Sequence, residues 1–280
     1  MNPALSTIAL PPGDHAAALG RLRRLGYQGV EVAPSRRWSD TWKGLAAAEV
    51  DAYRCDIEAA GLQVVGLHSL LYDQPGMTLF GEKANEPRLL DFMMHLSAVC
   101  RDLGGRTLIW GAGRRRGVIP RPEARRRAIG FLERLCAQVA DHGTIFCFEP
   151  LGPADDDFIN KAADALDLVT AVDHPALRIQ LDAKALVENG EAGEATFAEV
   201  RPYLVHFHAN EPGLGVLGDT GWVDHAALGQ CLRDIGYDGW VSIEQRMLNA
   251  ADPLADVARS AAVLRRCYSG ALALDAPADA

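Results

Sequence analysis

The chain has 280 residues, of which 49% are hydrophobic, and its formal net charge at pH 7 is −9. This acidic balance argues against a general nucleic-acid binder and against a protein of anionic membrane surfaces, because either would need a basic face. The hydrophobic content is sufficient for a large core, and α/β barrels of about 250 residues fold as one unit.

Short apolar runs alternate with longer amphipathic runs, a pattern typical of a parallel sheet built from βα units. The predicted strands cover residues 6–10, 29–32, 63–68, 106–110, 144–149, 177–182, 203–208 and 239–244. The predicted helices cover residues 15–25, 47–60, 86–103, 122–142, 161–172, 195–201, 224–235 and 253–267.

Eight strand–helix pairs favour an α/β fold of the (β/α)₈, or TIM barrel, type. An open doubly wound sheet is disfavoured, because it usually has fewer strands and a glycine-rich first turn that this chain lacks. We expect one barrel domain over residues 1–268 and a flexible C-terminal tail over residues 269–280.

The chain contains six cysteines, and none of them lies in a C-x-x-C pair. This usage is typical of buried thiols in a reducing compartment. The N-terminus shows no basic segment followed by an apolar one, and no apolar run reaches the ~18 residues of a membrane span. We therefore expect a cytoplasmic protein without a signal peptide and without a membrane segment.

Predicted strands five to eight each carry a metal-binding side chain at or near the C-terminal end. These residues are Glu149, Asp182, His208 and Glu244. The C-terminal ends of the strands form the active-site face of such a barrel. Divalent cations prefer oxygen ligands, and Mn²⁺ also accepts an imidazole, so we expect Mn²⁺ here, with Mg²⁺, Co²⁺ or Zn²⁺ as alternatives. Free coordination positions would bind two oxygens of a polyol or hydroxy-ketone.

A single carboxylate at a strand end is more often a helix N-cap than a metal ligand. Four candidate ligands on consecutive strands favour a metal site, because unrelated caps would not recur so regularly. His206 and His208 face the same side of a strand. We favour His208 as the ligand because it lies nearer the C-terminal end, and we interpret His206 as a packed interior residue.

Further residues near the strand ends are candidates for substrate contacts: His68, Trp110, Lys184, Asn210, Glu211 and Arg246, together with Glu31. Lys184 and Arg246 each lie two residues after a ligand and would share its face on a continuing strand. Trp110 could stack on a sugar ring. The run 114–116, three arginines in a row, is either a solvated loop or an anion site. If this run and Lys184 both point inward, the substrate is anionic.

The runs Glu149-Pro150, Leu181-Asp182, His206-Phe207-His208 and Ile243-Glu244 resemble the metal motifs of the xylose-isomerase-like TIM barrel superfamily, the sugar phosphate isomerase/epimerase family. The ligand spacing is similar to that of the ketose 3-epimerases. The resemblance implies a divalent-metal-dependent isomerase or epimerase acting on a small sugar, keto-sugar or sugar acid. It also implies that Glu149 and Glu244 bind the metal and form the acid/base pair of a metal-stabilised enediolate mechanism. Homodimers or homotetramers are usual in this group.

Two positions depart from the ketose 3-epimerase pattern. Those enzymes typically carry a histidine three residues after the ligand aspartate and an arginine six residues after the ligand histidine, where this chain has Ala185 and Leu214. Both family residues hold sugar hydroxyls, so the departures argue against a simple free-ketose 3-epimerase.

Three other functions are compatible with parts of this pattern. A metal-dependent dehydratase (a lyase) of the inosose or dehydroshikimate type would use the same chemistry to expel a β-hydroxyl. A DNA-repair nuclease of the endonuclease IV type would need a three-zinc cluster, yet the fourth predicted strand ends without a ligand, and the charge disfavours DNA. A non-catalytic sugar-binding protein would have little need of two opposed glutamates.

Overall fold

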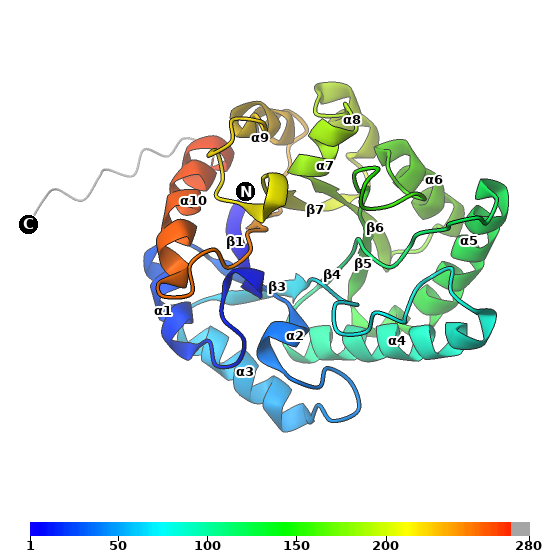
Figure 1. Cartoon of the computed structure of the whole chain (residues 1–280), viewed down its shortest axis with the longest axis horizontal. Helices are drawn as coiled ribbons and strands as arrows, with labels where there is room; N and C mark the ends of the chain where they lie inside the picture. Colours follow the sequence, from blue (N-terminus) through cyan, green and yellow to red (C-terminus); the bar gives the residue numbers. More distant parts are fainter. Residues whose placement is uncertain (270–280) are drawn as a thin grey trace, which may run out of the picture.

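In the computed structural model, which describes residues 1–269, eight parallel strands form one closed barrel in chain order (Figure 1). The strands are β1 (Asn2–Ser6), β2 (Gly29–Val32), β3 (Gln63–Leu67), β4 (Thr107–Trp110), β5 (Ile145–Phe148), β6 (Leu177–Asp182), β7 (Leu204–Ala209) and β8 (Trp240–Ile243). Strand β8 pairs with β1 and closes the barrel. The TIM barrel prediction is confirmed. The predicted tail lies, apart from its first residue, outside the described residues.

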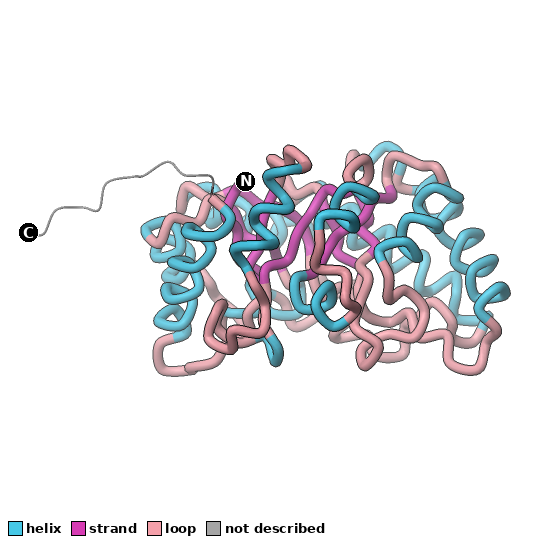
Figure 2. The backbone as a smooth tube through the Cα atoms, turned by 90° about the horizontal axis from the view of Figure 1, so that it is seen from above, coloured by secondary structure: helices cyan, strands magenta, loops and turns pink. Residues whose placement is uncertain are grey.

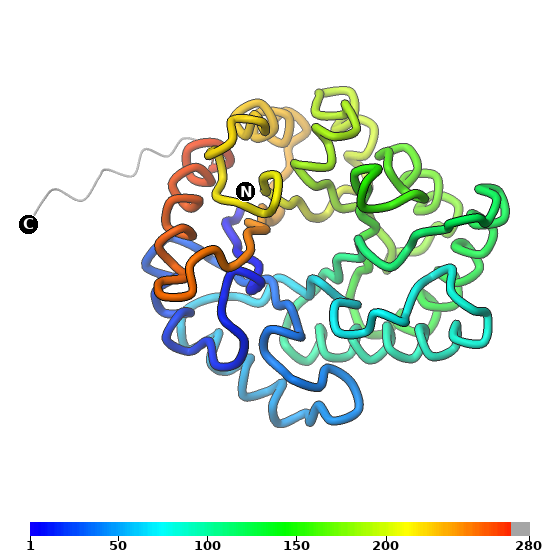
Figure 3. The backbone as a smooth tube through the Cα atoms, in the orientation of Figure 1, coloured from blue at the N-terminus to red at the C-terminus, as the bar shows by residue number. Residues whose placement is uncertain are grey.

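Helices form a ring around the barrel (Figure 1), and they lie outside the central strands when the barrel is seen from the side (Figure 2). The α-helices are α1 (Ala16–Arg24), α2 (Pro34–Arg37), α3 (Ala47–Ala59), α4 (Glu86–Asp102), α5 (Arg121–Gln138), α6 (Ala162–Val172), α7 (Ala183–Glu188), α8 (Glu194–Val200), α9 (His225–Asp234) and α10 (Pro253–Tyr268). The 3₁₀ helices are η1 (Thr7–Ala9), η2 (Lys83–Asn85), η3 (Ala140–His142) and η4 (Pro212–Leu214). The chain runs once around the barrel, so its last helix packs beside its first (Figure 3).

The helices pack on the strands through apolar stripes. Helix α4 buries Leu89, Phe92, Met93 and Leu96, which recur at the three- and four-residue spacing of one helix face. Among residues 1–269, no helix combines the length and the apolar character that crossing a membrane requires.

Two local predictions differ from the structure. The first strand was predicted over residues 6–10 but lies at Asn2–Ser6, so the two share only Ser6. The Ser6 hydroxyl accepts a hydrogen bond from the Ile8 amide, and the chain turns there into η1. The chain after β6 was predicted to continue as strand, which is wrong: helix α7 begins at Ala183, directly after the strand. No loop residues separate the two elements, so the boundary lacked the usual glycine or proline signal.

The register of the sheet brings the last strands' polar ends together. The pairing of β6 with β7 shifts between Ile179 and Gln180. After this shift, Asp182 lies directly beside His208. The backbone amide of Glu244 donates to the Ala209 carbonyl at 3.0 Å, which places Glu244 at the same level of the barrel.

The barrel interior is very tight where β3 meets β4. A Cβ atom added to Gly66 would lie 1.9 Å from the backbone oxygen of Thr107. That oxygen belongs to the neighbouring strand and cannot move away without disturbing the sheet, so only glycine fits at this position.

We therefore expect Gly66→Ala to lower the free energy of unfolding by roughly 2–3 kcal/mol, as overpacking of a rigid interior does. Urea denaturation measures this change. The matched control is Gly76→Ala, because a Cβ atom there meets nothing within 4 Å. Equal stability of the two variants would show that the sheet adapts to the extra methyl group.

Candidate metal centre

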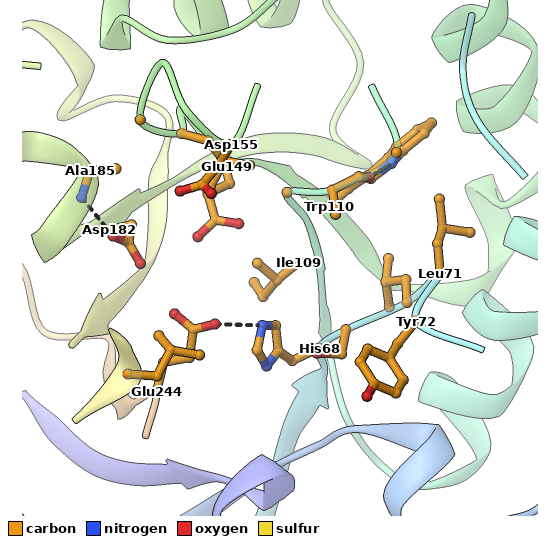
Figure 4. A pocket seen from close by; sticks show the side chains of 18 of the residues that line it. His68, Leu71, Tyr72, Ile109, Trp110, Glu149, Asp155, Asp182, Ala185 and Glu244 are labelled. Carbon is orange, nitrogen blue, oxygen red and sulfur yellow. Dashed lines mark hydrogen bonds and ion pairs between the residues drawn. The ribbon is translucent and has the colours of Figure 1, made fainter. Parts of the chain in front are cut away.

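The four predicted ligands come together at the C-terminal end of the barrel. The Nδ1 atom of His208 lies 3.6 Å from Glu149 Oε1, 4.0 Å from Asp182 Oδ2 and 3.6 Å from Glu244 Oε2. Figure 4 shows the three carboxylates facing a common space. The ligand atoms of Glu149, Asp182 and His208 form one cluster that could hold a cation, and His208 belongs to a second such cluster with His68 and Glu244.

The donors present fit a divalent cation. His208 Nδ1 is buried and has no hydrogen-bond partner. Burial raises the pKa of Asp182 well above its usual value, and the neighbouring charges of Glu244 and Glu149 raise it further. Three buried carboxylates repel one another unless a positive charge lies between them. A bound cation would supply that charge and would also satisfy His208 Nδ1.

A fully buried carboxylate, Glu31, orients the histidine from below. Its Oε2 lies 2.9 Å from His208 Nε2, and its Oε1 lies 3.0 Å from His206 Nε2. The Ser242 hydroxyl donates to Oε2 at 3.2 Å. Burial by itself would raise the pKa of Glu31, but the two imidazoles hold it well below its usual value. An ionised Glu31 therefore fixes the His208 ring so that Nδ1 faces the carboxylates, as carboxylates behind metal-binding histidines do.

Two amide side chains hold the carboxylates in place. Gln180 Nε2 donates to Glu149 Oε1 at 2.7 Å. Asn210 Nδ2 donates to Asp182 Oδ2 at 2.6 Å and to Glu244 Oε2 at 2.7 Å. The Asn210 oxygen accepts from the backbone amide of Lys184, which fixes the direction of the side chain. Asn210, predicted as a substrate contact, thus joins two candidate ligands.

Asp182 combines the two roles that its sequence position suggested. Its Oδ1 accepts from the Ala185 amide at 2.8 Å and caps helix α7, while Oδ2 faces His208. The cap holds the carboxylate rigid, so one aspartate both begins the helix and contributes to the centre.

His68 contacts Glu244 and lines the cavity. Its Nδ1 lies 3.0 Å from the Ser6 hydroxyl, and its Nε2 lies 3.1 Å from Glu244 Oε1. Burial would raise the pKa of Glu244, but the hydrogen bond to His68 and the charge of that imidazole outweigh burial and lower it to about 2. Glu244 is therefore ionised at neutral pH.

The carboxylates open into a cavity of about 720 Å³ at the barrel mouth. Its walls come from the loops after β3, β4, β5 and β7 and from the start of α7. Gly111 lies at the floor, where an added Cβ atom would stand 2.1 Å from Glu149 Oε2. Glycine at this position thus leaves room for the Glu149 carboxylate.

Lys184 borders this cavity, but from helix α7 and not from a strand face. Its ammonium group lies 2.9 Å from Asp155 and 2.9 Å from Glu188. Both partners are carboxylates, so the positive charge of Lys184 is already neutralised.

Three other candidate residues are not presented to the cavity as expected. Trp110 borders the cavity but is only 1% exposed. Its ring packs edge-on against Phe131, Phe146 and Phe148, in the layer between the barrel and the helices. Glu211 is buried and accepts from the Gly218 amide, the Thr220 hydroxyl and His225, so it holds the loop after β7. Arg246 is exposed. Strand β8 ends at Ile243, so the alternation of side chains between the two faces of a strand does not extend to Arg246.

The arginine run 114–116 binds protein groups. Arg114 is fully buried, pairs with Asp156 at 3.1 Å and donates to the Gly111 and Glu149 carbonyls. The side chains of Arg115 and Arg116 donate to backbone carbonyls. The prediction of an anion site in this run is therefore not supported by the geometry.

The supporting residues Gln180 and Ser242 were not predicted. Each lies two residues before a candidate ligand, Gln180 before Asp182 and Ser242 before Glu244, and each has apolar residues directly before and after it. Side chains two residues apart on a strand point to the same face. Polar residues at positions 180 and 242 therefore indicated that the barrel interior below the candidate ligands is polar.

The family described as xylose isomerase-like TIM barrel matches residues 19–267, and the chain belongs to this family. Over 113 residues the chain is 34% identical to a D-psicose 3-epimerase from Ruminiclostridium cellulolyticum. This match spans 40% of the chain but only 38% of that relative.

Two solved structures share the fold over nearly the whole chain. A D-psicose 3-epimerase with D-tagatose from Clostridium cellulolyticum H10 superimposes with a TM-score of 0.80, at 17% identity, over 96% of this chain and 99% of that one. A 3-keto-D-glucoside 4-epimerase from E. coli superimposes with a TM-score of 0.79, at 21% identity, over 95% of this chain and 100% of that one.

The contact between Glu31 and His208 predicts an effect on metal affinity. We expect Glu31→Gln to weaken Mn²⁺ binding by about 10- to 100-fold, because a neutral amide cannot accept equally from both imidazoles and no longer fixes the His208 ring. Competition with a fluorescent chelator measures this affinity. The matched control is Glu211→Gln, which neutralises an equally buried carboxylate outside the centre. Unchanged affinity in both variants would show that His208 is oriented without Glu31.

Proposed function

We propose that the chain is a divalent-metal-dependent sugar isomerase or epimerase that moves a proton at a carbon next to a carbonyl group. The observation that carries this proposal is the pair Glu149 and Glu244, which face one cavity from either side of Asp182 (Figure 4) and each lie 3.6 Å from His208 Nδ1. A site that only binds sugar has no need of two opposed carboxylates. The similarity to sugar epimerases supports the choice of reaction.

The residues that would hold the cation are Glu149, Asp182, His208 and Glu244, and we propose Mn²⁺ because the set contains one imidazole among carboxylates. When bound, a divalent cation supplies Lewis-acid polarisation of a substrate carbonyl, which acidifies the neighbouring C–H bond.

The two glutamates would act as acid and base. Glu244, ionised at neutral pH, is able to accept a proton from the substrate carbon. Its Oε1 contacts His68, which would stabilise the charge on the carboxylate. Glu149, held at Oε1 by Gln180, has Oε2 free beside Gly111 to exchange a proton on the other face. Proton removal on one face and return on the other inverts the configuration at that carbon.

The proposal predicts exchange of a substrate proton with solvent. We expect the Mn²⁺-loaded protein to incorporate deuterium from D₂O next to the carbonyl of at least one ketose, detected by NMR. Either Glu149→Gln or Glu244→Gln should lower the exchange rate by at least about 100-fold, because each removes a proton-transfer group. Metal content is measured in the same samples to separate lost chemistry from lost metal.

The surface variant Glu123→Gln serves as a control, since that carboxylate contacts only Arg126 and Arg127 on α5. Full exchange in a Gln variant would remove that glutamate from the acid/base pair. A conjugated, ultraviolet-absorbing product would instead identify a dehydratase on the same barrel. Assembly into dimers or tetramers and a cytoplasmic location remain predictions.

A further inference from the structure

The charges that line the cavity do not suit an anionic substrate. Its acidic groups are Glu149, Asp155, Asp182 and Glu244, and its single ammonium group is that of Lys184. With the imidazole of His68 also charged, a divalent cation in the centre would bring this set close to neutrality. No surplus of positive charge would then remain to hold a phosphate or carboxylate on the substrate.

Within residues 1–269, no arginine lines the cavity, and the positive charge of Lys184 is already paired with carboxylates. Lys184 lies between Asp155 and Glu188. Arg114 is enclosed by Asp156 and two carbonyls, and Arg115 and Arg116 bind carbonyls of neighbouring loops. An anionic group would have to displace these partners, so the walls select for an uncharged substrate.

The wall opposite Asp182 is largely apolar. It comes from the loop after β3, where Leu70, Leu71 and Met77 are buried and Tyr72 is 77% exposed. Figure 4 shows Leu71 and Tyr72 on the side of the cavity away from Asp182. The same loop also offers Gln74 and Thr78, which are polar but carry no charge.

This wall is anchored in the fold. Leu71 packs against Gly113, where an added Cβ atom would lie 2.6 Å from Leu71 Cδ1. The Leu79 amide donates to the Gly113 carbonyl at 2.8 Å and ties the loop after β3 to the loop after β4. Leu214, in the loop after β7, adds a further apolar side chain to the cavity lining. Its backbone is in the left-handed region, with φ at 53°, a conformation that is unfavourable for leucine.

The size of the cavity agrees with a substrate larger than a free sugar. Its volume of about 720 Å³ lies in the range of pockets that enclose drug-sized ligands. A sugar whose carbonyl end is held at the carboxylates would direct its remote carbon toward the mouth. There, a bare hydroxyl would meet leucine side chains, whereas an apolar group would be removed from water.

We propose that the substrate is an uncharged sugar with an apolar substituent on the carbon remote from its carbonyl, and that the loop after β3 binds this substituent. This inference rests on the proposed function, because the proton-transfer site defines which end of the sugar lies at the carboxylates.

Three ketoses that differ only at carbon 6 test the inference: D-fructose, D-fructose 6-phosphate and 6-O-benzyl-D-fructose. Binding to the Mn²⁺-loaded protein is measured by calorimetry. We expect the benzyl derivative to bind at least about tenfold more tightly than D-fructose, from burial of its ring, and the phosphate to bind more weakly. Equal or absent binding of the benzyl derivative, or tighter binding of the phosphate, would overturn the inference.

Variants of the wall localise the effect. Tyr72→Ser should reduce the preference for the benzyl derivative over D-fructose to less than about threefold. The control Val118→Ser removes a fully exposed apolar side chain that does not line the cavity, and the preference should persist. A preference that survives Tyr72→Ser and Leu71→Ser would place the substituent elsewhere and overturn the assignment.

Deuterium exchange measured on the same three sugars separates the two proposals. Benzyl-selective binding without exchange into any of them would uphold the apolar wall and count against the proton-transfer function. Exchange without any benzyl preference would uphold the function and overturn the substrate class.

Discussion

Three carboxylates lie in one buried space at the barrel mouth, and the side chains around them counteract the repulsion between their charges. Asp182 has neighbours of the same charge on both sides and an elevated pKa. Asn210 bridges two of the carboxylates, and Gln180 binds the third. Amide donors are neutral and cannot cancel the charge, so they position the carboxylates, and a bound cation would balance them. The unpartnered Nδ1 of His208 points to the same requirement.

The interior below the ligands is polar, although inward-facing residues of such barrels are mostly branched and apolar. Glu31, His206 and Ser242 contact one another or His208, and the barrel holds them without solvent. The network is only partly satisfied, because Glu31 Oε1 and both ring nitrogens of His206 are buried without a hydrogen-bond partner of good geometry, although Glu31 Oε1 lies 3.0 Å from His206 Nε2. The apolar filling is found elsewhere in the barrel, at Ile109, Ile145 and Cys147.

The alternation of short apolar and longer amphipathic runs was sufficient to predict the barrel, because each βα unit carries its own periodicity. The sequence also predicted which side chains meet at the centre, since carboxylates and a histidine at the ends of parallel strands converge. Residues with partners far along the chain were less predictable. Arg114 depends on Asp156, and Glu211 depends on His225, so their roles follow from tertiary contacts that no local pattern encodes. Lys184 was placed on the wrong element because Asp182 begins a helix without an intervening loop.

The candidate centre and the cavity walls come from different parts of the fold. The candidate ligands and Glu31 belong to the strands or to the residues directly after them, where the register of the sheet fixes them. The outer walls come from loops, which change more freely because few buried contacts constrain them. The barrel fold is retained at 17–21% identity with sugar epimerases. Ala185 and Leu214 lie on the cavity walls, and both are apolar. Under the proposed function, the residues at the strand ends would carry the chemistry, while the walls would select the substrate.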